Sequence, residues 1–228
     1  MLARRGDVRR RRGIFRLVLL VAAAAGARGQ GGAAARDMFY SPAAPLGLRY
    51  SVLQETAGGG VMETDPESVF RSGDRIRLAI EANERAHLYI VQRGSSGNWS
   101  LLFPSPEIAG GENVIEKGRR YETPAGYWFA FDEQPGKERL FVVLARRPEP
   151  DLGKMIQALG RQDGGPQQRG LDDAAVARIR SRVGARDLLF EKVAPAAAGG
   201  KKETAVYVVN QTGAADSRVV ADVVLNHQ

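Results

Sequence analysis

The sequence has no cysteine and only two histidines, His87 and His227, among its 228 residues. Without cysteine the chain forms no disulfide, and it lacks the residue to which a bacterial lipid anchor is attached. A zinc site needs three or four ligands at defined spacing, and no such pattern occurs. A Ser-His-Asp triad has only these two histidines to draw on, and no Gly-x-Ser-x-Gly elbow is present. These absences argue against a disulfide scaffold, a zinc enzyme and the common serine hydrolases.

Phosphate-binding patterns are missing as well. Neither Gly-x-x-x-x-Gly-Lys-Ser/Thr nor Gly-x-Gly-x-x-Gly occurs in the chain. One acidic cluster, Glu63, Asp65 and Glu67, has oxygen ligands that suit calcium, although a polar loop is the simpler interpretation. A carboxylate pair for glycoside chemistry stays open, because the fold decides the separation of such groups. We therefore predict no catalytic residue, no metal ligand and no cofactor.

The net charge of +7 belongs to the N-terminal segment. The chain has 33 Lys and Arg against 26 Asp and Glu, and residues 1–29 hold eight of the arginines and a single acid, Asp7. The remaining 25 basic and 25 acidic residues leave residues 30–228 neutral. A protein that binds nucleic acid carries a basic surface on its folded part. The charge distribution thus predicts no nucleic-acid partner.

Residues 1–29 have the three-part layout of a secretory signal peptide. Residues 9–12 are all arginine, and residues 17–25 form an apolar run. The small residues Ala27 and Gly29 mark two possible cleavage positions. The apolar run is shorter than the roughly 20 residues that span a bilayer, so we expect no transmembrane segment in the mature chain. The alternatives are an uncleaved membrane anchor and a basic arm that binds nucleic acid.

The predicted signal places the protein outside the cytoplasm. Arg11 and Arg12, followed by Gly13 and two apolar residues, also fit a loose twin-arginine pattern, which exports proteins that have already folded. We therefore expect a periplasmic or extracellular protein, with the twin-arginine route as one option. Exchanging both arginines for lysine would block export by that route.

Beyond residue 47 the apolar residues recur mostly with a period of two. Residues 30–47 are rich in Gly, Ala and Pro and are interpreted as a linker, which leaves 48–228 as a single domain. Short strand-like runs follow, separated by turn residues, at 48–54, 75–81, 88–91, 99–103, 127–131, 140–145, 188–193, 205–209 and 219–225. This spacing is typical of a mostly β protein with an antiparallel β-sandwich.

The alternation is interrupted at about 151–184, where the pattern becomes helical. Asp151 suits the start of a first short helix, and Asp172 and Asp173 suit the start of a second, which ends at Gly184. The sequence thus predicts a two-helix insertion between late strands of the sandwich.

Two features bear on surface contacts. Residues 94–98 are expected to be the tip of a hairpin that leads into a strand, where Trp99 shares a face with Leu101 and Phe103. Aromatic side chains further along the chain suit either the core or a surface that binds a glycan or peptide. Trp128 falls on the opposite face from its aromatic neighbours, so it is our candidate surface contact, together with Tyr121.

Five stretches in order carry a resemblance to a known family: residues 70–78, 87–91, 99–104, 112–115 and 135–143. Together they resemble the family called domain of unknown function 4384, most strongly over residues 66–148. The resemblance implies a β-rich module that is secreted or associated with the bacterial envelope. Members are sometimes joined to peptidase or kinase domains that carry the chemistry. No catalytic residue of the family is known, so none is transferred.

Three hypotheses about function follow. The first is an exported, non-catalytic β-sandwich module that binds a protein or another envelope component. The second is an assembly subunit that acts through an edge strand, with residues 219–225 as the expected edge. The third is a hydrolase with a pair of carboxylates, which requires two such groups in one concave pocket.

Overall fold

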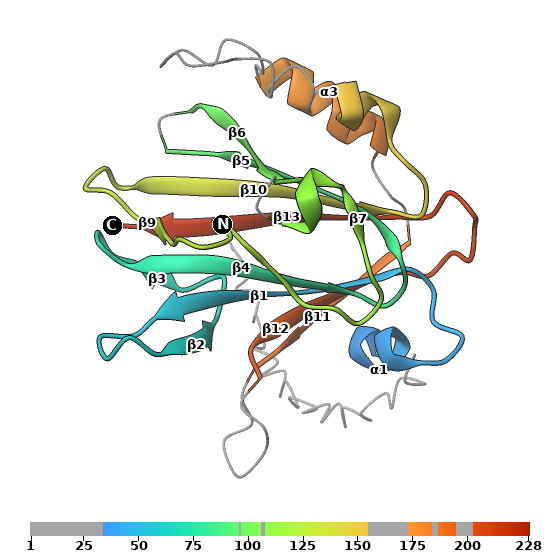
Figure 1. The fold of residues 1–228 in the computed structure, drawn as a ribbon, viewed down its shortest axis with the longest axis horizontal. Helices are drawn as coiled ribbons and strands as arrows, with labels where there is room; N and C mark the ends of the chain where they lie inside the picture. The colour runs from blue at the N-terminus through green and yellow to red at the C-terminus, as the bar shows by residue number, and fades with distance from the viewer. Residues whose placement is uncertain (1–33, 96, 106–107, 155–172, 184–186, 195–202) are drawn as a thin grey trace, which may run out of the picture. The chain divides into compact units, whose positions relative to one another are not determined.

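The computed structural model describes residues 34–95, 97–105, 108–154, 173–183, 187–194 and 203–228 (Figure 1). The predicted signal peptide, with Ala27 and Gly29, lies outside the described residues. All described residues belong to one compact unit that spans residues 33–228. Within these ranges, none of the helices has the length and apolar character needed to cross a membrane.

The described strands form two sheets packed face to face. Sheet A has seven strands, five of which follow the order β11 (Leu188–Val193), β12 (Ala205–Asn210), β1 (Gly47–Glu55), β4 (Arg75–Ala82) and β8 (Tyr121–Thr123). Beside these, β2 (Val61–Thr64) pairs with β1, and β9 (Phe129–Ala130) pairs with β4.

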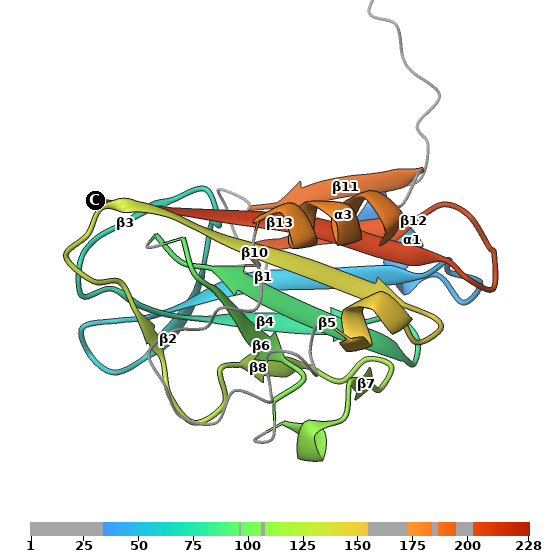
Figure 2. The same cartoon turned by 90° about the horizontal axis from the view of Figure 1, so that it is seen from above.

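Sheet B has six strands within the described residues. Five follow the order β3 (Val69–Phe70), β13 (Arg218–His227), β10 (Gly136–Ala145), β5 (Ala86–Arg93) and β6 (Trp99–Phe103), and β7 (Val114–Ile115) pairs with β5. The described strand pairs are antiparallel except for β3 with β13. The chain is therefore mostly β with a largely antiparallel, sandwich-like arrangement of two sheets, as its sequence predicts (Figures 1 and 2).

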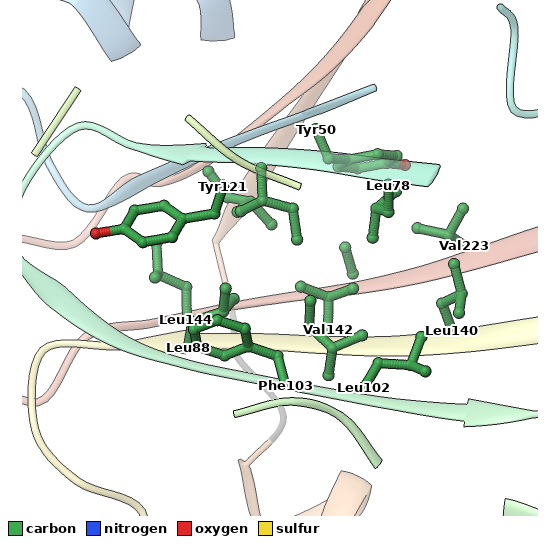
Figure 3. Packing of buried hydrophobic residues seen from close by; sticks show 14 of the residues in the cluster. Tyr50, Leu78, Leu88, Leu102, Phe103, Tyr121, Leu140, Val142, Leu144 and Val223 are labelled. Carbon is green, nitrogen blue, oxygen red and sulfur yellow. The ribbon is translucent and has the colours of Figure 1, made fainter. Parts of the chain in front are cut away.

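The core lies between the two sheets, where alternate residues of each strand meet. On β13, Val219, Ala221, Val223 and Leu225 are buried, whereas the residues between them are partly or fully exposed. Figure 3 shows side chains of both sheets interleaving in this core. Burial of such apolar area is the main force that holds the sheets together.

A short helix covers the outer face of each sheet. On sheet A, α1 (Ala35–Tyr40) packs through Phe39 against Tyr207 and Val209 of β12. On sheet B, α3 (Asp173–Val183) packs through Val176 against Phe141, and a helical turn at 150–154 adds Leu152. Since β10 is covered on both faces, its apolar residues run without alternation, as the sequence indicates.

The predicted insertion is present in part. Both of its helical segments occur, while residues 155–172 and 184–186 lie outside the described residues. Asp173 stands in the first turn of α3 and accepts hydrogen bonds from Arg93 Nε at 2.8 Å and Trp99 Nε1 at 2.9 Å. The helix is thereby tied to sheet B through β5 and β6.

Two expectations about packing are wrong. Residues 34–47 are no linker, because they contain α1, and because Phe39 and Leu46 are buried. Trp99 and Leu101 face α3, but Phe103 faces the inner core instead. The cause is a register shift in the β5–β6 hairpin, where Val91 pairs with Leu101 and the preceding residue pairs with Phe103. The predicted hairpin itself is confirmed.

Candidate functional site

The two candidate contact residues differ in their surroundings. Tyr121 is only 6% exposed and lies in the inner core near Phe103, with its hydroxyl accepting a hydrogen bond from Glu116 N at 3.0 Å (Figure 3). Trp128 is half-buried, and the guanidinium of Arg77 covers its ring at 4.2 Å. The neighbouring Tyr127 is more accessible than either of them, at 56% exposed. The structure therefore does not join Tyr121 and Trp128 into one site.

The strongest candidate site is a charged pocket on the outer face of sheet A. The register of three neighbouring strands brings its side chains together. Arg49 of β1 pairs with Tyr207 of β12 on one side and with Glu81 of β4 on the other. Directly paired residues point to the same face of a sheet. The three side chains therefore form a row across three strands, although they lie far apart in the sequence.

Arg49 is the centre of this pocket. Its side chain is 9% exposed, and it donates from Nη2 to Glu63 Oε1 and from Nε to Glu203 Oε1, each at 3.0 Å. The same Nε also lies 3.3 Å from the hydroxyl of Tyr207. Burial alone would lower the pKa of Arg49, but these acceptors outweigh it and raise the pKa above its ordinary value. The guanidinium is therefore a permanent charge.

The two acids bound to Arg49 are fully occupied. Glu63 accepts from Ser51 Oγ at 3.1 Å and Arg120 Nη1 at 3.2 Å on one oxygen, and from Thr204 N at 3.0 Å on the other. Burial favours a higher pKa for Glu63, yet the Thr204 and Arg49 hydrogen bonds prevail and lower it. This carboxylate stays ionised and cannot easily change its partners.

Glu203 is held in the same way. The Tyr207 hydroxyl donates to its Oε1 at 2.6 Å, and Arg36 Nε lies 3.4 Å from its Oε2. Against the effect of burial, the hydrogen bonds from Tyr207 and Arg49 lower the pKa of Glu203. Both acids of the network therefore serve to neutralise and fix Arg49.

Glu81 is different, because its carboxylate makes no hydrogen bond to any residue that the structure describes. Burial raises its pKa above the ordinary value, and the positive charges of Arg49 and Arg120 offset this only in part. A half-buried carboxylate without a partner is costly in a folded protein. Glu81 thus provides the carboxylate of the pocket that is available to a ligand.

The pocket has a volume of about 350 Å³ and is lined by Arg36, Tyr40, Arg49, Glu63, Glu81, Arg120 and Glu203. Arg36 and Arg120 stand at its rim, with side chains 47% and 39% exposed. A ligand there meets one free carboxylate and two accessible guanidinium groups. Within the described ranges, no cluster of three or more His, Asp or Glu is arranged to hold a metal ion.

The sequence singled out Glu63 for a different reason. The acidic cluster considered for calcium is divided, because Glu63 faces Arg49 whereas Asp65 and Glu67 bind Lys192 Nζ at 3.0 and 2.6 Å. Sequence reasoning missed Glu81 and Glu203 entirely. Glu81 follows the apolar alternation of β4 as an ordinary outward residue, so only strand register reveals its neighbours.

The unpartnered carboxylate of Glu81 predicts a specific pH dependence of stability. Its pKa is raised in the folded state, so the folded protein loses stability as pH increases from the ordinary glutamate pKa to the folded value. Glu81→Gln is expected to raise the free energy of unfolding at pH 7–8 by up to about 1 kcal/mol, and to change nothing below pH ~4. Chemical denaturation across this pH range measures the difference. An equal effect at both ends would contradict the assignment.

Searches against the curated proteins and against the solved structures found no match. A family model does match, over the part of the chain that runs from β3 through β10 to the residues just after it. That part supplies β4 and Arg120 to the pocket, while β1, β2 and β12 lie outside it. The matching model is DUF4384, a domain of unknown function, and the match covers residues 69–148 of this chain.

Proposed function

We propose that this protein is an exported, non-catalytic module that binds a protein or another envelope component through the charged pocket. The observation that carries the proposal is Glu81, a half-buried carboxylate without a hydrogen-bond partner among the described residues. Its position at a concave surface, beside accessible arginines, is what a recognition site for a polar group requires. Export rests on the signal-like N-terminal segment, and the neutral charge of residues 30–228 speaks against a nucleic-acid partner.

The arrangement favours binding over hydrolysis. A carboxylate pair needs one group as acid and a second that is free to act as base or nucleophile. Glu63 and Glu81 do have pKa values moved in opposite directions, which is the usual sign of such a pair. However, both oxygens of Glu63 are engaged by Arg49, Arg120 and the Thr204 N–H. The second carboxylate is therefore held by the structure and not free for a reaction.

The charges around the pocket define the chemistry of the group that it accepts. An ammonium fits the free carboxylate of Glu81, and a carboxylate fits the accessible guanidinium groups of Arg36 and Arg120. The volume of about 350 Å³ is at the small end of ligand pockets. A small zwitterion, such as a dipeptide with both termini free, meets all three conditions.

Glycylglycine is a suitable probe because each of its charges can be removed separately. In an NMR titration, we expect glycylglycine to bind at least fivefold more tightly than its N-acetyl or its amide derivative. Glu81→Gln should abolish the preference over the N-acetyl form. Arg120→Gln should abolish the preference over the amide. Glu116→Gln, an exposed acid paired with Arg85, is the matched control and should leave both preferences intact.

Equal affinity for all three compounds, or no binding of any, would contradict the proposed site. A hydrolase predicts another outcome, namely turnover of a bound substrate that Glu81→Gln removes without weakening the binding. The two functions are therefore separated by the same variant.

A further inference from the structure

One aromatic side chain faces the inside of the sandwich and yet is exposed. Phe190 of β11 pairs with Val208 of β12, and Val208 lies fully buried in the inner core. Phe190 therefore points to the same inner side, but it is 52% exposed. Leu188, two residues earlier on the same side, is only partly buried. Among the described residues, none forms a layer that covers this part of the inner face of β11.

In the described part of the chain, no strand of sheet B lies beside residues 219–225 of β13 to cover β11. Figure 2 shows β11 as the outermost strand on this side, lying beyond β13 of the opposite sheet. Among the described residues, β13 pairs with β10 along its whole length and with β3 only at Asn226 and His227. No described strand pairs with residues 219–225 on the side away from β10.

The backbone groups along this open edge can be assigned. The N–H of Gln228 donates to Phe70 O of β3, so residue 228 directs its backbone groups away from β10. Directions alternate along a strand. Val220, Asp222 and Val224 therefore also direct their N–H and C=O groups away from β10, into the gap beside β11. Since no described strand pairs with them, these groups are available to a further strand.

We propose that the gap between β11 and β13 accepts one extended segment of a partner protein, which adds to β13 as a further strand of sheet B. The added strand would pair with Val220, Asp222 and Val224 and would cover Phe190 and Leu188. Strand addition at an open edge is a general mode of peptide recognition, in which the backbone supplies affinity and alternate side chains supply specificity. This site is separate from the charged pocket, which lies on the outer face of sheet A.

The exposed inner face of β11 beside the open edge of β13 suits one added strand. The residues of β11 on this side favour apolar side chains in the partner segment. Leu188 and Phe190 face the gap, and the next inward residue, Lys192, is already bound by Asp65 and Glu67. The partner segment is therefore an uncharged strand with an apolar residue at every second position.

A donor strand fused to the full chain tests this proposal directly. After Gln228 we would add a twelve-residue Gly/Ser linker and the segment Thr-Val-Thr-Val-Thr-Val-Thr, with an all-Gly/Ser extension of equal length as the reference. The donor is expected to raise the melting temperature by roughly 4 °C or more. It should also slow hydrogen exchange at the amides of Val220, Asp222 and Val224 at least tenfold.

Two variants of the fusion remove the effect by different means. Val224→Pro deletes one N–H on the open side and leaves the pairing with β10 intact, so the fold is retained but the donor should no longer stabilise it. Phe190→Asp places a charge where the donor has valine and should have the same result. Tyr127→Asp is the matched control, a similarly exposed aromatic residue elsewhere, and should retain the full shift.

A donor fusion that melts and exchanges like the reference would overturn the proposal. An equal rise in melting temperature with Phe190→Asp and Val224→Pro would do so too, because the strand would then bind elsewhere. Glycylglycine titration of the charged pocket is independent of these results. Failure of one proposal is thereby distinguished from failure of the other.

Discussion

Arg49→Ala is expected to lower the free energy of unfolding by about 3–5 kcal/mol, because it removes a buried guanidinium and leaves Glu63 and Glu203 as partly buried charges without that partner. Arg36 and Arg120 also contact these acids, but from the exposed rim, where ion pairs contribute little. Urea denaturation at pH 7 measures the loss. Arg75→Ala is the matched control. It removes an ion pair with Glu55 that is about half exposed, and it should cost less than about 1 kcal/mol.

Arg49→Ala should also change how the free energy of unfolding depends on pH in the acidic range. The pKa values of Glu63 and Glu203 are lowered in the folded state, so their contribution is present above the ordinary glutamate pKa and is lost as pH falls through the folded values. Without Arg49 these pKa values move up and the contribution becomes smaller, because only the hydrogen bonds from groups such as Thr204 and Tyr207 still lower them. As pH decreases below 5, the free energy of unfolding of Arg49→Ala should therefore fall less steeply than that of the wild type. Parallel acid profiles would contradict the central role of Arg49.

Phe141→Ala is the second change with a large expected effect, about 3–5 kcal/mol. Phe141 is 2% exposed and lies in the outer cluster of sheet B, where Val176 of α3 and Leu152 pack, with the Arg180 guanidinium 5.2 Å above its ring. Truncation removes both the apolar contact and the surface on which α3 rests. Thermal denaturation measures the total loss.

Limited proteolysis distinguishes local release of α3 from a loss of stability of the whole domain. If Phe141 holds α3, cleavage near Asp173–Val183 should accelerate in Phe141→Ala more than global unfolding explains. Phe190→Ala is the control, since that ring is already half exposed and its removal should cost less than about 1 kcal/mol. Uniform protection of α3 in both variants would show that the hydrogen bonds of Asp173 to Arg93 and Trp99 suffice to hold it.

Strand periodicity made most of this fold predictable. Runs such as 188–193 and 99–103 reappear as β11 and β6 with the same bounds, because alternating or continuous apolar residues between turns leave few other structures. The helix α1 was not predictable in this way. It has only six residues, so its stability comes from the packing of Phe39 on Tyr207 rather than from helix propensity.

The charged pocket could not be predicted from the sequence for another reason. Arg49 and Glu203 are 154 residues apart, and their meeting depends on which strands are neighbours and in which register. Local patterns carry no information about such pairing. The shift in the β5–β6 hairpin has the same origin, since one additional residue turned Phe103 from the predicted side of the strand to the other.

The order of strands also determines when this protein can fold during its synthesis. The first long strand, β1, pairs with β12, and β10, which lies between β5 and β13, waits for a partner that ends at His227. Sheet A cannot be completed before β12 has left the ribosome, nor sheet B before β13, and contacts of such high sequence separation form slowly. Until then the apolar strands β4, β5 and β10 lack their covering layer and are prone to aggregate. We expect a ribosome-bound chain that ends before β12 to remain protease-sensitive, and a cell that makes this protein to rely on chaperones for the unfinished sandwich.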